Sequence, residues 1–369
     1  MYPRVYPLQD MFLGTAAPHV KNRTDNRLVF PAGPGSQTQA ICKWISSNLH
    51  EHFPHIMQEL LRCFSWWQAN QQQTPVLVLD DKELKQEYAR DFVGVLEKSF
   101  GVQVVKNRLF LPNKTDSNFV YTDVNIYSQP PHLVERAWFQ IHNLQDAALL
   151  RKETLKLAKE NKERDDRNLA EATTNELLGG CPGEGGPLSA SKKQPVIAFL
   201  NRNGDRHVEN IGDILEALKK TKVLGHTLGI LDIHYISSFD QLSFWEQVDV
   251  MSKVDIVIGP HGAQFTSVAF LPACGGLFEL FPKGYYYPNY FGSLARTTGH
   301  YHFHLYTGGM NIDAELNQDM MTLEGRMEAR SRHVIANVDL VLQGVQQLAE
   351  RWQSCCERRL QGGTVESLF

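Results

Sequence analysis

Several common features are missing from this 369-residue sequence, and each absence excludes a class of protein. No apolar run crosses a membrane, because the most apolar stretch, 254–281, holds Asp255 and His261, whose polar groups lipid would leave unsatisfied. Neither sign of charge dominates, since 37 basic and 41 acidic residues give a formal net charge of −4. This balance argues against a protein that coats nucleic acid.

The usual short motifs of nucleotide and metal sites are also missing. There is no Walker A sequence, which excludes P-loop hydrolysis, and no GxGxxG after a predicted strand. No Asp-x-Asp tripeptide occurs, so a metal-held phosphate site built on such a carboxylate pair is not expected. The six cysteines form no CxxC pair and are scattered. They therefore predict neither a structural zinc site nor a disulfide scaffold.

Composition divides the chain into parts. Thirteen of the 21 residues from 151 to 171 are charged, and the run 179–187 is rich in glycine and proline. We interpret 151–193 as a flexible insert between an N-terminal domain, 1–150, and a C-terminal domain, 194–325, followed by a terminal region, 326–369. A surface loop within one domain is the alternative interpretation of the insert.

Strands alternate with helices on both sides of this insert. In the first half, strands at 76–79 and 102–105 flank a helix with apolar residues at every fourth position from 84 to 100, which ends near Gly101. Together they form one βαβ unit, and another helix is expected at 52–67. The alternation predicts an α/β fold with parallel sheets.

The second half repeats the pattern more clearly. We expect strands at 196–200, 230–236, 254–258, 277–281 and 301–306, with a short helix after the turn at 259–263. Asn210 and Asp213 resemble a capping box at the start of another helix. The amphipathic segment 334–352 predicts a terminal helix, which we expect to pack back on the N-terminal domain.

Residues suited to binding an anion follow two of these strands, at the sheet edge where ligands of parallel sheets bind. The turn from Gly259 through His261 and Gly262 to Ala263 leads into a helix start, whose free amides and dipole attract a diphosphate. An ordinary turn with a structural histidine is the alternative. Arg202 and Arg206 in the preceding loop are suited to phosphate, with two solvated arginines as the alternative.

One carboxylate stands inside an apolar strand of the same predicted sheet. Glu279 lies within 277–281, and a carboxylate there needs a partner. The hydroxyls of a ribose are one candidate and a buried ion pair is the other. Together with the arginines and the glycine turn, Glu279 predicts a nucleotide-diphosphate site.

Three blocks of the chain resemble glycosyltransferase family 61. Residues 254–282 are similar to the pattern D-x-x-I-G-x-H-G-A, followed by F-L-P and E-L/I-F-P. Residues 200–210 are similar to a loop of the type S-R-x-x-x-R-x-x-x-N, and residues 48–53 to an N-x-x-H-H/x-F segment. The resemblance extends from about residue 45 to 350.

This resemblance implies a fold and an activity. The expected fold is GT-B-like, with two Rossmann-type domains facing across a cleft. The expected activity is inverting transfer of GlcNAc or a pentose from a UDP-sugar to a hydroxyl of a glycan or glycoprotein, without a required cofactor or metal. The family also implies the lumen of the endoplasmic reticulum or Golgi, and because no signal or anchor is visible, we expect a truncated N-terminus.

Residue roles are carried over by position. Arg202, Arg206 and Asn210 line the donor loop, with His261 and Glu279 also at the donor site. His52 would face the acceptor and is the first candidate for the general base, ahead of the carboxylates Glu51, Glu59 and Asp123. Two alternatives stay open: a non-catalytic nucleotide-sugar or glycan-binding protein of the same fold, and a Rossmann-type dehydrogenase or methyltransferase, against which the missing GxGxxG argues.

Overall fold

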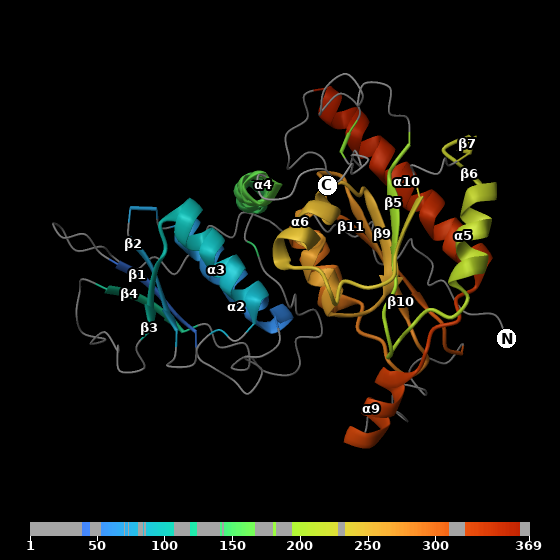
Figure 1. Cartoon of the computed structure of the whole chain (residues 1–369), viewed down its shortest axis with the longest axis horizontal. Coiled ribbons are helices and arrows are strands. Elements are labelled where there is room, and N and C mark those ends of the chain that lie inside the picture. The colour runs from blue at the N-terminus through green and yellow to red at the C-terminus, as the bar shows by residue number, and fades with distance from the viewer. Residues whose placement is uncertain are drawn as a thin grey trace, which may run out of the picture.

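A computed structural model describes residues 39–44, 53–69, 71–72, 74–79, 84, 86–106, 119–123, 141, 144–166, 180–181, 194–227, 233–309 and 322–361. Its architecture is mixed α/β, with one parallel sheet in each half of the chain (Figure 1). The predicted α/β class is therefore confirmed. None of the helices in these ranges is long and apolar enough to cross a membrane.

Four parallel strands form the N-terminal sheet. Their order is β3 (Gln103–Lys106), β2 (Thr74–Leu79), β1 (Gln39–Trp44) and β4 (Phe119–Asp123). Helix α3 (Glu87–Phe100) joins β2 to β3 and confirms the predicted βαβ unit, and Gly101 ends it with a left-handed φ of 65°. Helix α2 (Phe53–Ala69) matches the helix expected at 52–67, whereas β1 and β4 were not predicted.

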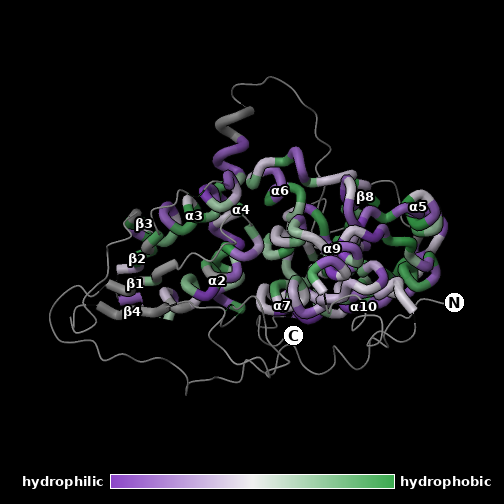
Figure 2. The backbone as a smooth tube through the Cα atoms, turned by 90° about the horizontal axis from the view of Figure 1, so that it is seen from below, coloured by the Kyte–Doolittle hydropathy of each residue, from purple (hydrophilic) through white to green (hydrophobic). Residues whose placement is uncertain are grey.

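Five parallel strands form the C-terminal sheet, and all five were predicted. Their order is β11 (Tyr301–Tyr306), β10 (Gly276–Phe281), β9 (Ile256–Pro260), β5 (Ile197–Leu200) and β8 (Ile233–Ile236). The helices between them are α5 (Ile211–Lys220), α6 (Phe244–Ser252), the 3₁₀ helix η3 (Ala263–Phe270) and α7 (Asn289–Thr297). Helix α5 is amphipathic, with Ile214 and Leu218 buried, and Figure 2 shows it alternating between hydrophobic and hydrophilic residues.

The two sheets share one apolar layer. Helices α2 and α3 of the N-terminal half face α6 and η3, which cover the near side of the C-terminal sheet (Figure 1). Phe53, Phe92 and Phe244 come from three of these helices and meet edge to face, with ring centroids 6.3–6.4 Å apart. This aromatic contact fixes the N-terminal half against the side of the sheet that carries η3.

The terminal helix lies elsewhere than expected. Helix α10 (Val338–Leu360) covers the opposite side of the C-terminal sheet, beside α5. Its buried residues Val341, Val345 and Leu348 join the core formed by β5, β9, β10 and β11. The prediction that it packs back on the N-terminal domain is therefore wrong. Its apolar residues are buried instead against the C-terminal sheet, whose last strand, β11, precedes it in the chain.

The charged segment after residue 150 begins inside a helix. Helix α4 (Leu144–Asp166) runs through the expected boundary at 150/151 and packs on α6 and η3. Thr154 is fully buried, and Arg151 lies 3.0 Å from the ring nitrogen Nε2 of His300 and donates to the carbonyl of Leu271 at 3.2 Å. The first part of the expected insert is therefore docked on the C-terminal half. Residues 167–179 and 182–193 lie outside the described residues.

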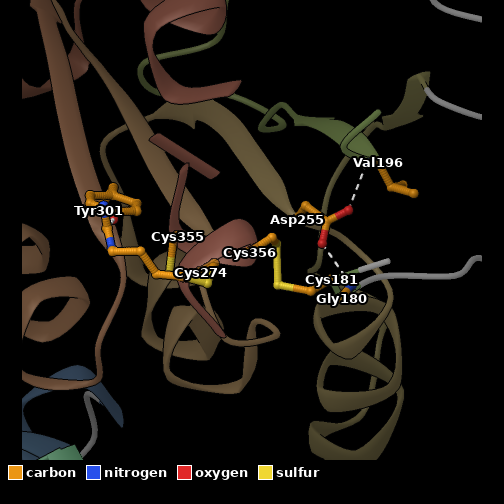
Figure 3. The surroundings of a disulfide bond; sticks show 9 residues. Gly180, Cys181, Val196, Asp255, Cys274, Tyr301, Cys355 and Cys356 are labelled. Carbon is orange, nitrogen blue, oxygen red and sulfur yellow. Dashed lines mark hydrogen bonds between the residues drawn. A yellow bond between two sulfur atoms is a disulfide. The ribbon is translucent and has the colours of Figure 1, made fainter. Parts of the chain in front are cut away.

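All six cysteines are paired, contrary to the expectation that they form no disulfide scaffold. The pairs are Cys42–Cys63, Cys181–Cys356 and Cys274–Cys355, with Cα–Cα separations of 5.9, 5.2 and 5.6 Å. The last two tie distant segments to neighbouring positions of α10 (Figure 3). These disulfides were not predicted, because the spacing of cysteines along the chain does not indicate which distant segments meet in the fold.

Candidate functional site

A loop with two arginines follows the carboxyl end of strand β5, which lies between β9 and β8. The fully buried side chain of Asn201 closes this loop, because its amide donates to the carbonyl of Val208 at 3.2 Å and accepts from the Val208 amide at 2.9 Å. Arg202 and Arg206 lie within the closed loop, and Arg206 has a left-handed φ of 62°. The two hydrogen bonds of Asn201 therefore hold both arginines at the carboxyl edge of the sheet, where ligands of parallel sheets bind.

Arg206 is a buried cation. Its side chain is only 3% exposed, its guanidinium carbon lies 5.3 Å from the centre of the Tyr285 ring, and its Nε has no hydrogen-bond partner in the described chain. Burial, followed by the charge of Arg202, lowers the pKa of Arg206 to about 10, so it is still positive at neutral pH. No salt bridge to either arginine occurs among the described residues, and the charges of Asp240 and Asp205 act on Arg202 only at longer range.

The two glycines of the following turn are required by close contacts. A Cβ on Gly259 would lie 2.1 Å from the carbonyl oxygen of Leu200, and a Cβ on Gly262 would lie 2.0 Å from the guanidinium Nη1 of Arg202. Gly262 is extended, with φ 175°, so space and not backbone conformation selects glycine there. Gly262 thus lets Arg202 lie against the turn, where its Nη1 is 3.5 Å from the carbonyl of His261.

A buried chain of side chains lies behind this turn. Nδ1 of His261 is 2.8 Å from one carboxylate oxygen of Glu279, and Nε2 of His302 is 2.7 Å from the other. Glu279 is fully buried, His302 is 2% exposed and His261 is 6% exposed. Of the two partners left open for Glu279, the structure therefore shows buried side chains and not an open face for ribose hydroxyls.

Burial sets the protonation of this chain. It raises the pKa of Glu279 well above its usual value. Burial, with the nearby arginines, lowers the pKa of His261 well below the usual range, and burial with His304 does the same for His302. Both histidines are therefore neutral at pH 7, and burial favours the protonated form of the carboxyl group.

Asn210 has a different partner from the one predicted. It forms no side-chain cap on α5. Instead its amide donates to the carbonyl of Ala336 at 2.7 Å and accepts from the Ala336 amide at 3.0 Å. Next to it, Val208 and Val334 form a parallel bridge. Asn210 thus fastens the segment before α10 to the base of the arginine loop.

This connection brings a third arginine towards the site. Helix α9 (Leu323–Ser331) ends three residues before the bridge at Val334 and carries the exposed Arg330 near its end. After burial, the charge of Arg330 is among the causes that lower the pKa of Arg202 and Arg206. Neither this helix nor a role for Arg330 was predicted from the sequence.

An aromatic segment covers the site from the side of the N-terminal half. Tyr285 and Tyr290 contact the ring of His261, with centroids 5.6 and 6.0 Å away. Tyr290 also meets His55 of α2, its hydroxyl lying 3.3 Å from Nδ1. Burial lowers the pKa of His55, so it is neutral at pH 7. One histidine of the N-terminal half therefore reaches the site through a single tyrosine.

Asp255, the first residue of the motif around the glycine turn, has a structural role. Its carboxylate accepts from the backbone amides of Gly180 and Val196, each at 2.7 Å (Figure 3). It thereby fastens the residue before Cys181 to the residue before β5. Because Asp255 is fully buried, these two charge-assisted bonds are its means of stabilising the fold.

The structure brings together most of the predicted donor-site residues. Arg202, Arg206, Gly259, Gly262, Ala263 and His261 meet at the carboxyl ends of β5 and β9, with Glu279 behind them and Asn210 at the base of the loop. The acceptor-side predictions are different: His52 and Glu51 lie outside the described residues. Glu59 lies in α2 and Asp123 in β4, but their side chains are not among those described.

Fold and site together define a class of protein. A parallel α/β sheet with one buried and one half-buried arginine, a glycine turn and a helix start at its carboxyl edge has the features typical of sites for phosphorylated ligands. Residues 53–277, which make up more than half of the chain, match the sequence model of the family Glycosyltransferase 61. The chain therefore belongs to this family of glycosyltransferases. A search of curated proteins finds no match.

Proposed function

We propose that this chain is an inverting glycosyltransferase that moves a sugar, GlcNAc or a pentose, from a UDP-sugar to a hydroxyl of a glycan or glycoprotein. The observation that carries the proposal is the buried guanidinium of Arg206, whose Nε has no partner in the described chain. A buried cation without a counter-ion is unfavourable. A diphosphate that bridges Arg206 and Arg202 removes that penalty.

In this proposal the site residues divide into two groups. Arg202, Arg206, His261 and the amides that follow Gly262 contact the diphosphate, with Gly259 shaping the turn. Glu279 and Asn210 support them, since Glu279 holds the ring of His261 and Asn210 fixes the base of the arginine loop. The ribose role first considered for Glu279 is replaced by this supporting role, because both of its oxygens are already engaged.

The reaction follows from this arrangement. The acceptor hydroxyl attacks the anomeric carbon on the face opposite UDP, a general base takes its proton, and the arginines stabilise the charge that develops on the leaving diphosphate. The two sheets are proposed to act as the facing domains of a GT-B-like fold, with 194–325 binding the donor and 1–150 the acceptor. The base comes from the N-terminal side, with His52 as first candidate.

His55 is a second candidate for the base. It lies on α2 three positions beyond His52, contacts Tyr290 of the C-terminal half, and is neutral at pH 7 because burial lowers its pKa. His52→Ala and His55→Ala separate the two candidates. Loss of the base lowers kcat while leaving UDP affinity within about threefold of wild type, as expected for a group that does not touch the donor.

Two further parts of the proposal concern metal and compartment. Two arginines with a third nearby, and no Asp-x-Asp tripeptide in the sequence, favour transfer without a metal ion. Activity that survives EDTA treatment supports this, whereas activity restored only by Mn²⁺ or Mg²⁺ contradicts it. The endoplasmic reticulum or Golgi lumen is the proposed location. The three disulfides support it, since such bonds persist in oxidising compartments.

One assay separates the proposal from its alternatives. UDP release is measured from UDP-GlcNAc, UDP-xylose and UDP-arabinose with a panel of glycan and glycopeptide acceptors. Turnover of one of these donors supports the transferase. If no donor is turned over while UDP still raises the melting temperature, the chain is a nucleotide-sugar or glycan-binding protein of the same fold. If neither UDP nor any UDP-sugar binds, the donor-site assignment fails.

A further inference from the structure

We propose that His302 is a positioning residue of the donor site, which acts through Glu279 to make His261 a hydrogen-bond donor towards the phosphates. This inference rests on the proposed function, because it assigns the phosphates of a nucleotide as the group that faces His261. His302 belongs to β11 and is buried, so it contacts no ligand itself.

The geometry links the three side chains in one line. His302 Nε2 lies 2.7 Å from Oε2 of Glu279, and Oε1 of the same carboxyl group lies 2.8 Å from His261 Nδ1. Each carboxyl oxygen therefore serves one histidine. Of the three residues, His261 alone lies in the turn at the edge of the sheet, where its backbone carbonyl is 3.5 Å from Nη1 of Arg202. A substitution of His302 can therefore change the affinity for the ligand only through Glu279 and His261.

The number of protons in this chain leaves two arrangements. Burial favours a protonated carboxyl group and two neutral histidines, and in that state each of the two N···O contacts holds one hydrogen. In the first arrangement, His261 donates from Nδ1 to Glu279, which donates to His302, so Nε2 of His261 is an acceptor. In the second, His302 donates from Nε2 to Glu279, which donates to Nδ1 of His261, so Nε2 of His261 carries the proton.

An anion selects the second arrangement. Phosphate oxygens accept hydrogen bonds, so they repel a bare Nε2 lone pair and attract an Nε2–H group. The charges that face the chain favour neutral rings in either case, because Arg202, Arg206 and Arg330 act on His261, and His304 and Arg296 act on His302. His302 then begins a series of donors that ends at the ligand, and no proton enters or leaves the chain.

The structure also holds the ring of His302 in place. A Cβ on Gly292, in α7, would lie 2.5 Å from Nδ1 and 2.6 Å from Cε1 of this imidazole. The backbone of α7 therefore rests directly on the ring, and only glycine leaves room for it. The centre of the His304 ring lies 5.5 Å from that of His302. A ring confined between a helix and a neighbouring side chain is suited to fixing the orientation of a partner.

The test is a double-mutant cycle on UDP affinity, measured by isothermal titration calorimetry. His302→Phe keeps an aromatic ring and removes the donor, and we expect it to weaken UDP binding about tenfold, as loss of a charge-assisted hydrogen bond does. His302→Gln keeps a donor near the position of Nε2 and should restore most of the affinity. In a His261→Phe background, His302→Phe should have no further effect, because its route to the ligand is gone.

Other results overturn the inference. If His302→Phe weakens UDP binding as much in the His261→Phe background as in wild type, or if His302→Gln binds no better than His302→Phe, His302 does not act through His261. If His302→Phe fails to fold, Gly292→Ala displaces the ring without removing it and is measured instead. It should weaken UDP binding in wild type but not in the His261→Phe background, and equal weakening in both overturns the inference.

A spectroscopic readout is independent of affinity. ¹⁵N shifts of histidine distinguish the two ring tautomers, and UDP-bound wild type should show His261 protonated at Nε2, whereas the His302→Phe complex should show a mixture. Protonation at Nδ1 alone in the wild-type complex contradicts the inference. Failure of wild type to bind UDP at all contradicts the proposed function instead, so the two failures are distinguishable.

Discussion

Alanine at Gly262 and alanine at Gly259, the two glycines of the turn after β9, should have different effects on the stability of the fold. In Gly262→Ala the new Cβ meets the Nη1 atom of Arg202 at 2.0 Å, and that atom ends a flexible side chain. The extended backbone at Gly262 accepts alanine. We therefore expect the guanidinium to move away at a cost of less than about 1 kcal/mol in stability. Without its contact, UDP affinity falls about 10- to 100-fold.

Gly259→Ala is the matched control. Its Cβ would meet the carbonyl oxygen of Leu200 at 2.1 Å, and Phe265 lies 3.2 Å away on another side. Because the first obstacle is backbone of the neighbouring strand β5, relief requires β9 and β5 to separate. Overpacking of this kind costs about 1–3 kcal/mol or more. Gly259→Ala should therefore lower the free energy of unfolding. Any loss of UDP affinity in this variant should come with that destabilisation.

Both variants are measured by urea unfolding and by UDP titration. The expected pattern is weak binding with near wild-type stability for Gly262→Ala, and clear destabilisation for Gly259→Ala. The reasoning is refuted if Gly262→Ala binds UDP as tightly as wild type, since Arg202 would then not contact the ligand from its observed position. It is also refuted if Gly259→Ala is as stable as wild type.

Three further predictions concern stability. His300 and His304 are buried, with their pKa values lowered by burial to about 3 and about 4, so the unfolded chain binds more protons below pH 6.5 and stability falls on acidification. Each of these histidines lowers the free energy of unfolding by about 1.4 kcal/mol between pH 7.5 and 5.5. His304→Gln should remove the contribution of His304, so the free energy of unfolding should fall less steeply as the pH is lowered. An unchanged slope contradicts this. Asp255→Asn leaves one of the two backbone amides, of Gly180 or Val196, without an acceptor. It should lower the free energy of unfolding in urea by about 2 kcal/mol and leave UDP affinity unchanged. Wild-type stability of this variant would contradict the structural role of Asp255. Reducing the disulfides should lower stability by about 2–5 kcal/mol, and thiols that react with alkylating agents before reduction would contradict the pairing.

The sequence predicted β5, β9 and β10 of the C-terminal sheet because their apolar residues are nearly continuous. Strands buried on both faces, such as β9 and β10, leave no other interpretation when helices separate them. Strands β1 and β4 were missed because Gln39–Trp44 and Phe119–Asp123 are short and mix polar with apolar residues. Helix α9 escaped for a similar reason, since most of its residues are polar and exposed.

At the site, the sequence located residues that follow strands but not their partners. Arg202, Arg206 and His261 come directly after predicted strands, so parallel-sheet geometry alone brought them together. Glu279 was recognised as a buried carboxylate in need of a partner. The second partner, His302, was missed, although it alternates with His304 along a predicted strand. The register pairs Glu279 with His304, yet its carboxyl group contacts His302, and neither the register nor the direction of the side chain can be predicted from the sequence of one strand.

We propose above that a nucleotide diphosphate binds at the buried Arg206 of the loop after β5. The most direct test of this proposal is calorimetric titration of UDP into wild type, Arg206→Gln and Arg351→Gln, the last removing an exposed arginine of α10 as the matched control. We expect Arg206→Gln to weaken binding about 10- to 100-fold and Arg351→Gln to leave it unchanged. Equal affinity of Arg206→Gln and wild type for UDP would contradict it.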